Sequence, residues 1–250
     1  MRERDRLSRM PGRSCLFCGS RPVTREHVLP TWVYEALQVY GPITHTHGAR
    51  PVRITNVFDL VLRAVCATCN NGWLSDLEGR AKDTLTPAIT GQPATWDSKQ
   101  QELAALWAIK TAILLELSAR HIRGTGFAPA EHFTHLFTTR TPPPWSMCWT
   151  AGVDAKGRDI MWERVTALSL DGTTPQGYFA TVAVGYLVLH VFGWVQRAGS
   201  AARPMRPVIP PDLRPALAQV WPIVTPTMRW PPTTYFDGHQ QLTRLHRSDS

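Results

Sequence analysis

Cys15-Leu-Phe-Cys18 and Cys66-Ala-Thr-Cys69-Asn70-Asn71-Gly72-Trp73 are the two segments on which the organisation of the rest of the chain depends. Each Cys-x-x-Cys turn can present two thiolates to one cation, and two such turns complete the tetrahedral shell that zinc prefers. The spacing therefore predicts a structural zinc bound by all four cysteines, with no open coordination position. Such a site holds together two pieces of chain that are distant in sequence.

The five cysteines of the chain are interpreted as thiols rather than as disulfide partners. Residues 1–13 contain five arginines and no apolar core of the kind found in a secretory signal, so a cytoplasmic location is expected. No apolar run is long enough to span a bilayer, and no membrane partner is expected. Cys148 lies in a predicted strand and is interpreted as a buried apolar thiol.

The overall composition describes a basic protein that can form a sizeable core. Of its 250 residues, 43% are hydrophobic, and the formal net charge is +8. A positive balance favours polyanionic partners, of which nucleic acid is the commonest. Residues 1–13 are expected to form a flexible basic arm, either lying along phosphates or simply frayed.

The segment between the cysteine pairs begins with Thr24-Arg25-Glu26-His27-Val28-Leu29-Pro30. Its partly alternating pattern predicts a short strand that Pro30 ends, followed by a short helix over residues 31–39 with Thr31 as the N-cap. Residues 41–52, with two histidines and two prolines, are predicted to form a loop. Residues 54–65 are rich in β-branched side chains and predict one or two strands.

A helix is predicted to follow the second cysteine pair, because apolar residues recur there at helical spacing. Taken together, these segments resemble the zinc-bearing branch of the HNH nuclease family over about residues 13–82. The residues that match the family pattern are Cys15, Cys18, Glu26, His27, Val28, Pro30, Cys66, Cys69 and Asn70. The resemblance implies a ββα-metal arrangement, in which a β-hairpin and a helix are held by zinc.

The same resemblance implies hydrolysis of phosphodiester bonds. His27 matches the general base of the family, and a histidine can accept a proton from water near neutral pH. Glu26 and Asn70 match the residues that hold one divalent cation, and their oxygen ligands suit magnesium or manganese. The expected partner is nucleic acid, in particular double-stranded DNA, although DNA and RNA are not distinguished by these residues.

Three departures from the family pattern concern this catalytic centre. Glu26 stands where the family usually has Asp, and Val61 stands where the family has a middle Asn that orients the histidine; Asn56 is the nearest candidate for that role. No His or Lys follows Asn70 within the next helical turn, where Asn71, Asp76 or Glu78 are the available substitutes. Two hypotheses therefore stay open, a metal-dependent DNA endonuclease and a catalytically decayed, zinc-clasped nucleic-acid-binding protein.

The second half of the chain carries no motif that assigns a role. Residues 87–97 are predicted to be a linker, and Ser98 to cap a long helix with Gln101 completing a capping box. The helix is apolar nearly all round and is expected to be buried. Lys110 on this helix is either functional or a lysine whose ammonium reaches solvent along an apolar surface.

The rest of this half predicts a β-rich region. Strand candidates lie at residues 145–150 and 160–170, and residues 178–184 and 186–192 flank Gly185 as one long bent strand or as a tight pair. The expected fold class is therefore α+β, with an N-terminal ββα-metal (HNH-like) zinc domain at residues 14–86 and an α+β domain at residues 98–250.

Overall fold

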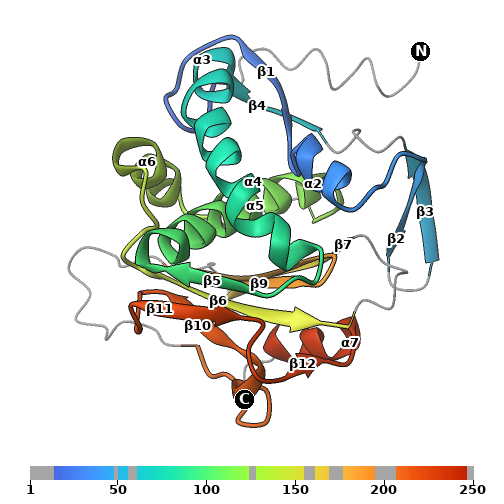
Figure 1. Ribbon diagram of the computed structural model, residues 1–250. Coiled ribbons are helices and arrows are strands. Elements are labelled where there is room, and N and C mark those ends of the chain that lie inside the picture. Colours follow the sequence, from blue (N-terminus) through green and yellow to red (C-terminus); the bar gives the residue numbers. More distant parts are fainter. Residues whose placement is uncertain are drawn as a thin grey trace.

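The computed structural model of the protein describes residues 14–47, 50–55, 61–123, 128–154, 161–168, 177–194 and 207–246. Within these ranges the fold is α+β, as the sequence predicts, with helices lying against a curled sheet (Figure 1). The basic arm predicted for residues 1–13 and the candidate residue Asn56 lie outside the described ranges.

The N-terminal part is built on two paired strands and the helices that follow them. β1 (Val23–His27) pairs antiparallel with β4 (Val61–Cys66), and a bulge interrupts the register between Thr24 and Arg25. The chain then turns into α3 (Ala67–Cys69), a π-helical turn η1 (Asn70–Leu74) and α4 (Ser75–Ile89). Two paired strands and a helix thus occur in this part, with a short helix and a second strand pair between β1 and β4 in sequence.

The connection between β1 and β4 differs from its prediction in three respects, the first being that its helix ends at Ala36 and not at residue 39. α2 (Thr31–Ala36) has Pro30 at its N-cap instead of Thr31, and the Pro30 carbonyl accepts a hydrogen bond from the Val33 N–H at 3.1 Å. Most described residues of the loop predicted at 41–52 are strand instead, because β2 (Ile43–His47) and β3 (Arg50–Thr55) pair antiparallel. The β-branched residues of both strands outweigh the proline and histidines that suggested irregular structure.

The linker predicted for residues 87–97 is ordered secondary structure. α4 continues past Pro87 to Ile89, whose side chain is fully buried, and β5 (Ala94–Asp97) follows. β5 pairs with β11 (Thr227–Trp230), which lies near the other end of the chain. The burial of the last helical turn and the pairing of β5 with β11 explain why this segment is ordered, although its local sequence predicted a linker.

α5 (Ser98–Arg123) is the long buried helix expected from the sequence, but its capping box lies one residue earlier than predicted. The Asp97 carboxylate accepts from the Gln100 N–H at 2.8 Å, and the Gln100 side-chain oxygen accepts from the Asp97 N–H at 3.0 Å. The pair Asp97 and Gln100 has the same spacing as the predicted pair Ser98 and Gln101, so the sequence pattern of a capping box fits both. Gln101 is instead buried and donates to the carbonyls of Trp96 and Thr225.

The main sheet has six strands, in the order β10–β6–β9–β8–β7 with β12 parallel to β6. Its strands are β6 (Ser146–Val153), β7 (Met161–Leu168), β8 (Gly177–Val184), β9 (Leu187–Trp194), β10 (Ala218–Trp221) and β12 (Tyr235–Phe236). β8 and β9 form the tight pair, because Gly185 turns the chain with a φ of +54°. A Cβ at Gly185 would lie 2.3 Å from the Ile89 carbonyl oxygen, so this close approach requires glycine.

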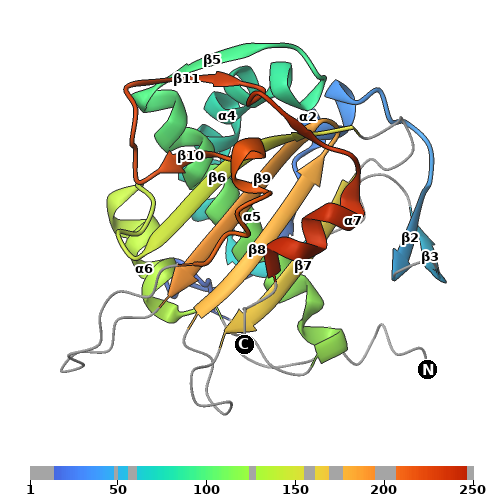
Figure 2. The same cartoon turned by 90° about the horizontal axis from the view of Figure 1, so that it is seen from below.

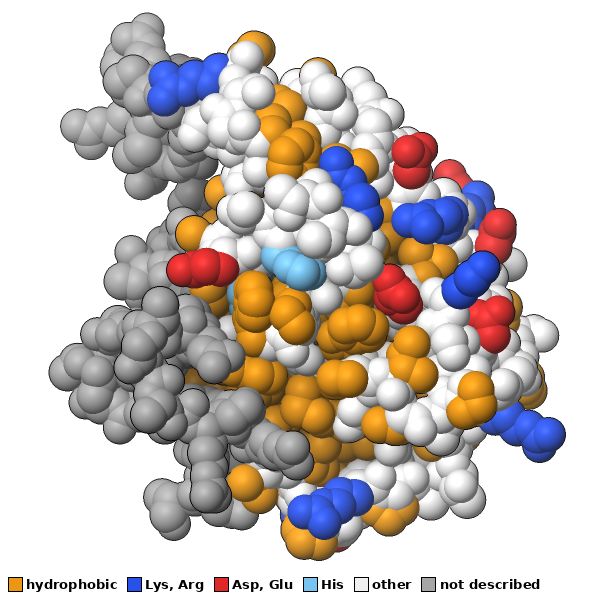
Figure 3. Space-filling view, turned by 90° about the vertical axis from the view of Figure 1, so that its left-hand side faces the viewer, with side chains coloured by type: hydrophobic (Ala, Val, Ile, Leu, Met, Phe, Trp, Pro, Cys, Tyr) orange, Lys and Arg blue, Asp and Glu red, His pale blue; other side chains and the backbone are white. Residues whose placement is uncertain are grey.

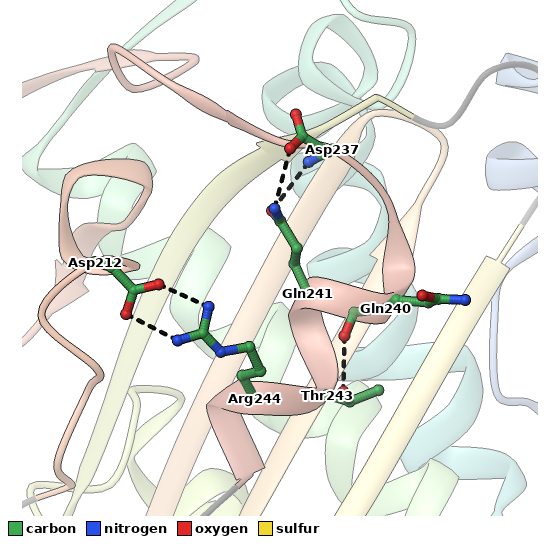
Figure 4. A network of polar contacts seen from close by, with 6 residues as sticks. All are labelled: Asp212, Asp237, Gln240, Gln241, Thr243 and Arg244. Carbon is green, nitrogen blue, oxygen red and sulfur yellow. Dashed lines mark hydrogen bonds and ion pairs between the residues drawn. The ribbon is translucent and has the colours of Figure 1, made fainter.

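Both faces of the sheet are covered. α5 lies against one face, and the C-terminal elements η2 (Arg214–Ala216), α7 (His239–Leu242) and η3 (Thr243–His246) lie across the other (Figure 2). Arg244 pairs with both carboxylate oxygens of Asp212 at 2.6 and 2.9 Å, and Gln241 donates to Asp237 at 3.1 Å (Figure 4). These contacts join residues of the C-terminal segment to one another at the surface.

One hydrophobic core extends through most of the described chain. It joins Leu29 and Leu77 from the N-terminal part with Trp107 of α5 and Leu189 of the sheet. α6 (Ala130–Thr139), which the sequence did not predict, packs Phe133 against the same core. Among the helices of the described ranges, none combines the length and apolar character needed to cross a bilayer.

A chain of buried polar side chains crosses the sheet beneath the C-terminal segment. The Thr181 hydroxyl lies 2.7 Å from both His190 Nδ1 and His246 Nε2, and His246 Nδ1 lies 3.0 Å from the Thr166 hydroxyl. Burial lowers the pKa of His190 to about 3. Burial, together with electrostatic interactions with His190 and Arg164 that disfavour a second positive charge, lowers the pKa of His246 to about 2. Both imidazoles are therefore neutral in the folded protein.

These histidines predict that acid destabilises the fold. Their folded pKa values lie below the ordinary value of 6.5, so the stability is fully present above about pH 6.5 and is lost as the pH falls below it. The loss is about 2 kcal/mol per histidine by pH 5. We expect the urea concentration at the unfolding midpoint to be lower at pH 5 than at pH 7.5, and we expect this decrease to be smaller in His246→Gln. An equal decrease in the wild type and the variant would contradict this assignment.

Candidate metal centre and adjoining polar cluster

The four predicted zinc ligands converge in the structure. The Sγ atoms of Cys15, Cys18, Cys66 and Cys69 all lie within 4.8 Å of one another, and those of Cys18 and Cys66 are 3.4 Å apart. Four ligands at a Zn–S distance of about 2.3 Å would be separated by roughly 3.8 Å, which is close to this spacing. The four cysteines can therefore bind a metal such as zinc.

Local backbone structure brings the first cysteine pair to the second. The Gly19 N–H donates to the Cys15 carbonyl at 2.9 Å, and Gly19 has a φ of +73°, so the first pair lies in a tight turn. The Leu16 N–H donates to the Ala64 carbonyl at 2.9 Å and attaches that turn to β4. Since β4 ends at Cys66, this bond sets the two pairs side by side.

The thiols of this cluster differ in their ease of ionisation. Hydrogen bonds from the Ser20 side chain and backbone lower the pKa of Cys18 to about 6, whereas burial raises the pKa values of Cys66 and Cys69. Several thiolates this close together repel one another unless a cation lies between them. A divalent cation bound between the four sulfur atoms would therefore favour their ionised form.

Glu26 and His27 lie at the end of β1 and have different surroundings. The Glu26 side chain is buried, with 6% of the residue exposed, and His27 is half-buried. Neighbouring strand residues point to opposite faces, which is the relation expected from the sequence. Burial raises the pKa of Glu26 to about 7; the Lys110 ammonium acts in the opposite direction, and the Glu78 carboxylate adds to the rise.

Lys110 does not reach solvent, so its interpretation as a lysine with an exposed ammonium is wrong. The residue is fully buried, and its ammonium forms an ion pair with Glu78 Oε1. The indole N–H groups of Trp32 and Trp107 donate to Glu78 Oε2 at 3.0 and 2.8 Å. The Glu78 carboxylate is thus the partner that compensates a buried ammonium.

Asn70 joins the start of the helical segment to β1. Its side-chain NH₂ donates to the Arg25 carbonyl at 3.1 Å and to the Thr24 hydroxyl at 3.4 Å, while the Thr24 hydroxyl donates to the Val65 carbonyl at 3.0 Å. Asn70 thus lies beside the backbone that leads directly into Glu26, and its side-chain oxygen is the atom left for a cation. Asn71, the alternative candidate, is exposed on η1.

Val61 stands directly opposite His27 in the pairing of β1 with β4. Residues opposite each other in an antiparallel pair share a face and lie within side-chain contact. The position at which the resembled family has its orienting Asn is therefore adjacent to the histidine, and here it carries an apolar side chain.

The sequence singled out the cysteines, Glu26, His27 and Asn70, but it did not predict the contacts of Trp32 and Lys110 with Glu78. A charged residue in the middle of an apolar helix was the available signal for Lys110. Its partner could not be found from spacing, because Glu78 belongs to α4 and the two indoles to α2 and α5.

On the face drawn in Figure 3, positively and negatively charged side chains are not separated into distinct patches. On its described part, hydrophobic side chains gather near the centre, and Lys and Arg side chains stand among Asp and Glu side chains. The net charge of +8 is therefore not concentrated on this face as a separate basic patch.

Comparison with known proteins found no relative of this chain. The sequence matches no protein-family model, no curated protein and no solved structure.

Proposed function

We propose that the protein is a metal-dependent endonuclease of the HNH type, with a ββα-metal arrangement built from β1, β4 and the helices that follow. The observation that supports this best is the bond from the Asn70 side chain to the Arg25 carbonyl, next to Glu26-His27. It spans 45 positions of sequence and sets Asn70 beside the backbone that leads into Glu26 and His27, the other two residues that the resemblance assigns to catalysis. The cysteine cluster lies at the other end of the same strand pair.

The chemistry follows from the residues that the proposal assigns. Glu26 and Asn70 would hold a magnesium or manganese ion, which supplies charge neutralisation at the scissile phosphate and the departing oxygen. His27 accepts the proton of the attacking water as the P–O bond to the leaving oxygen breaks. The four cysteines would hold zinc with all its positions filled, so that it has a structural role.

The first test is cleavage of supercoiled plasmid DNA in the presence of magnesium or manganese. We expect His27→Ala to lose roughly 10²- to 10⁴-fold in rate, the usual contribution of a general base. His239→Ala, on α7 at the opposite side of the molecule, is the matched control and is expected to cleave like the wild type (Figure 1). Equal cleavage by His27→Ala and the control would remove His27 from the mechanism.

Val61 favours the second candidate function, a zinc-clasped protein that binds nucleic acid without cleaving it. An apolar residue opposite His27 cannot hydrogen-bond the imidazole and orient it. If catalysis has decayed for this reason, Val61→Asn is expected to create or raise cleavage, and Val61→Leu is the matched control. No cleavage by wild type or by Val61→Asn, together with salt-sensitive DNA binding, would favour the binding protein.

A further inference from the structure

A hollow of about 610 Å³ lies where η1 and the start of α4 meet α5 and the end of α6. This volume falls in the range of roughly 300–1,000 Å³ that is usual for ligand sites. The hollow adjoins the proposed cation site, since η1 begins at Asn70. Its lining combines an aromatic ring, two apolar side chains and three charged ones: Trp73, Leu77, Leu106, Asp76, Arg80 and Arg140.

Arg140 is held in place by contacts within the protein. It is the C-cap residue of α6 and has a φ of +59°, in a backbone region that residues with a side chain rarely adopt. Its guanidinium carbon lies 4.5 Å from the centroid of the Trp73 ring and 4.7 Å from that of Phe137. Its Nη1 donates to the carbonyls of Leu136, at 3.4 Å, and Phe137. A guanidinium fixed in this way loses little conformational entropy when it binds an anion.

One edge of this guanidinium has no acceptor. The two carbonyls engage Nη1 alone, so the Nε–H and Nη2–H groups of Arg140 are unpaired within the described ranges. Two N–H groups on one edge of a planar guanidinium match two oxygens of one phosphate. Arg80, exposed on α4 and without an ion pair among the described residues, supplies a second guanidinium to the same hollow.

The charges in the hollow favour an anion. Two guanidinium groups stand against one carboxylate, that of Asp76, which forms no ion pair in the described part of the chain. The excess of one positive charge matches the single negative charge of a phosphodiester. The buried side chains of Leu77 and Leu106 add an apolar surface against which a sugar can pack.

We infer that this hollow binds a backbone phosphate of a nucleic-acid strand, with Arg140 as a bidentate contact and Arg80 as a second one. The inference rests on the proposed function only in taking nucleic acid as the substrate. The phosphate bound here is a different one from the scissile phosphate, because Glu26, His27 and Asn70 do not line the hollow. Through Arg140, the second half of the chain contributes to substrate binding.

DNA binding by the full-length, zinc-loaded protein tests this inference without relying on cleavage. Fluorescence anisotropy of a labelled DNA duplex, measured over a range of salt concentrations without added magnesium or manganese, gives the affinity and its salt dependence. The decisive variant is R80Q/R140Q, which removes both positive charges. R214Q is the matched control, because Arg214 is an exposed arginine on η2, across the sheet from α5, that also donates to a backbone carbonyl, that of Ile209 at 3.2 Å (Figure 2).

We expect R80Q/R140Q to bind the duplex at least tenfold more weakly than the wild type at low salt. The slope of log affinity against log salt concentration should become shallower by about 1, because one phosphate contact is lost. R214Q should keep both values. A folded R80Q/R140Q with wild-type affinity and slope would overturn the inference.

Should R80Q/R140Q not fold, R80Q takes its place, since Arg80 is exposed and its loss leaves the packing of Arg140 intact. A severalfold weaker affinity of R80Q would support the inference, and a wild-type affinity would overturn it. A competition experiment separates a strand from a free nucleotide as the source of the phosphate. Thymidine monophosphate at the concentration of the duplex should not displace it; displacement would assign the hollow to a free nucleotide and overturn the inference.

The result is separable from the fate of the nuclease proposal. If the wild type binds DNA and R80Q/R140Q binds it weakly, but neither cleaves it, the phosphate site stands and the nuclease activity falls. If His27→Ala loses cleavage while R80Q/R140Q binds and cleaves like the wild type, the nuclease proposal stands and the phosphate site falls. If the wild type does not bind DNA, both are overturned.

Discussion

Replacing Cys69 by alanine is expected to release zinc and to unfold the N-terminal part of the protein. Cys69 is buried at the start of the helical segment, and its Sγ is one of four that lie within 4.8 Å of one another. Binding of a structural zinc is worth about 10–16 kcal/mol in small zinc domains, and much of that free energy is folding free energy. We expect the zinc content to fall well below one per chain.

Elemental analysis and hydrogen exchange measure these effects directly. Exchange protection should be lost in β1 and β4, which the cysteine cluster joins at one end, while the main sheet keeps more of its protection. Cys148→Ala is the matched control, because Cys148 is fully buried in β6 away from the cluster and should cost only about 1 kcal/mol. Stoichiometric zinc in Cys69→Ala would contradict the four-cysteine site.

Replacing Lys110 by alanine is expected to lower the free energy of unfolding by about 3–5 kcal/mol, the usual cost of breaking a buried ion pair from one side. The substitution removes a fully buried side chain and leaves the Glu78 carboxylate without its ion-pair partner, while the Glu26 carboxyl group loses an electrostatic effect that favours its ionised form. Like charges at a buried site repel one another and raise the cost of keeping either ionised.

Urea unfolding at pH 7.5 measures the loss. Lys82→Ala is the matched control, since Lys82 forms an ion pair with Glu35 in which both side chains are more than half exposed. Exposed pairs contribute about 0–1 kcal/mol, so the control should stay within that range. A Lys110→Ala protein as stable as Lys82→Ala would show that the buried pair does not stabilise this fold.

Particular elements show where prediction from the sequence succeeded. The cysteine pairs, the strand that carries Glu26 and His27, and the helix after Cys69 follow from local spacing, because each ligand turn and each periodic run is set by residues within one segment. The capping box of α5 shows the limit, since two overlapping residue pairs satisfy the same local pattern. The carbonyl of Thr225, over a hundred residues away, engages Gln101 and removes it from that role.

By itself, the sequence determined the α+β class, the four candidate metal ligands and the segment that carries Glu26 and His27. Only the tertiary structure decided that Lys110 of α5 pairs with Glu78 of α4, and that β5 pairs with β11 instead of forming a linker. The physical reason is that a buried charge takes its partner from whichever element packs beside it. That neighbour is set by the shared core, which has no signature in the spacing of residues along the chain.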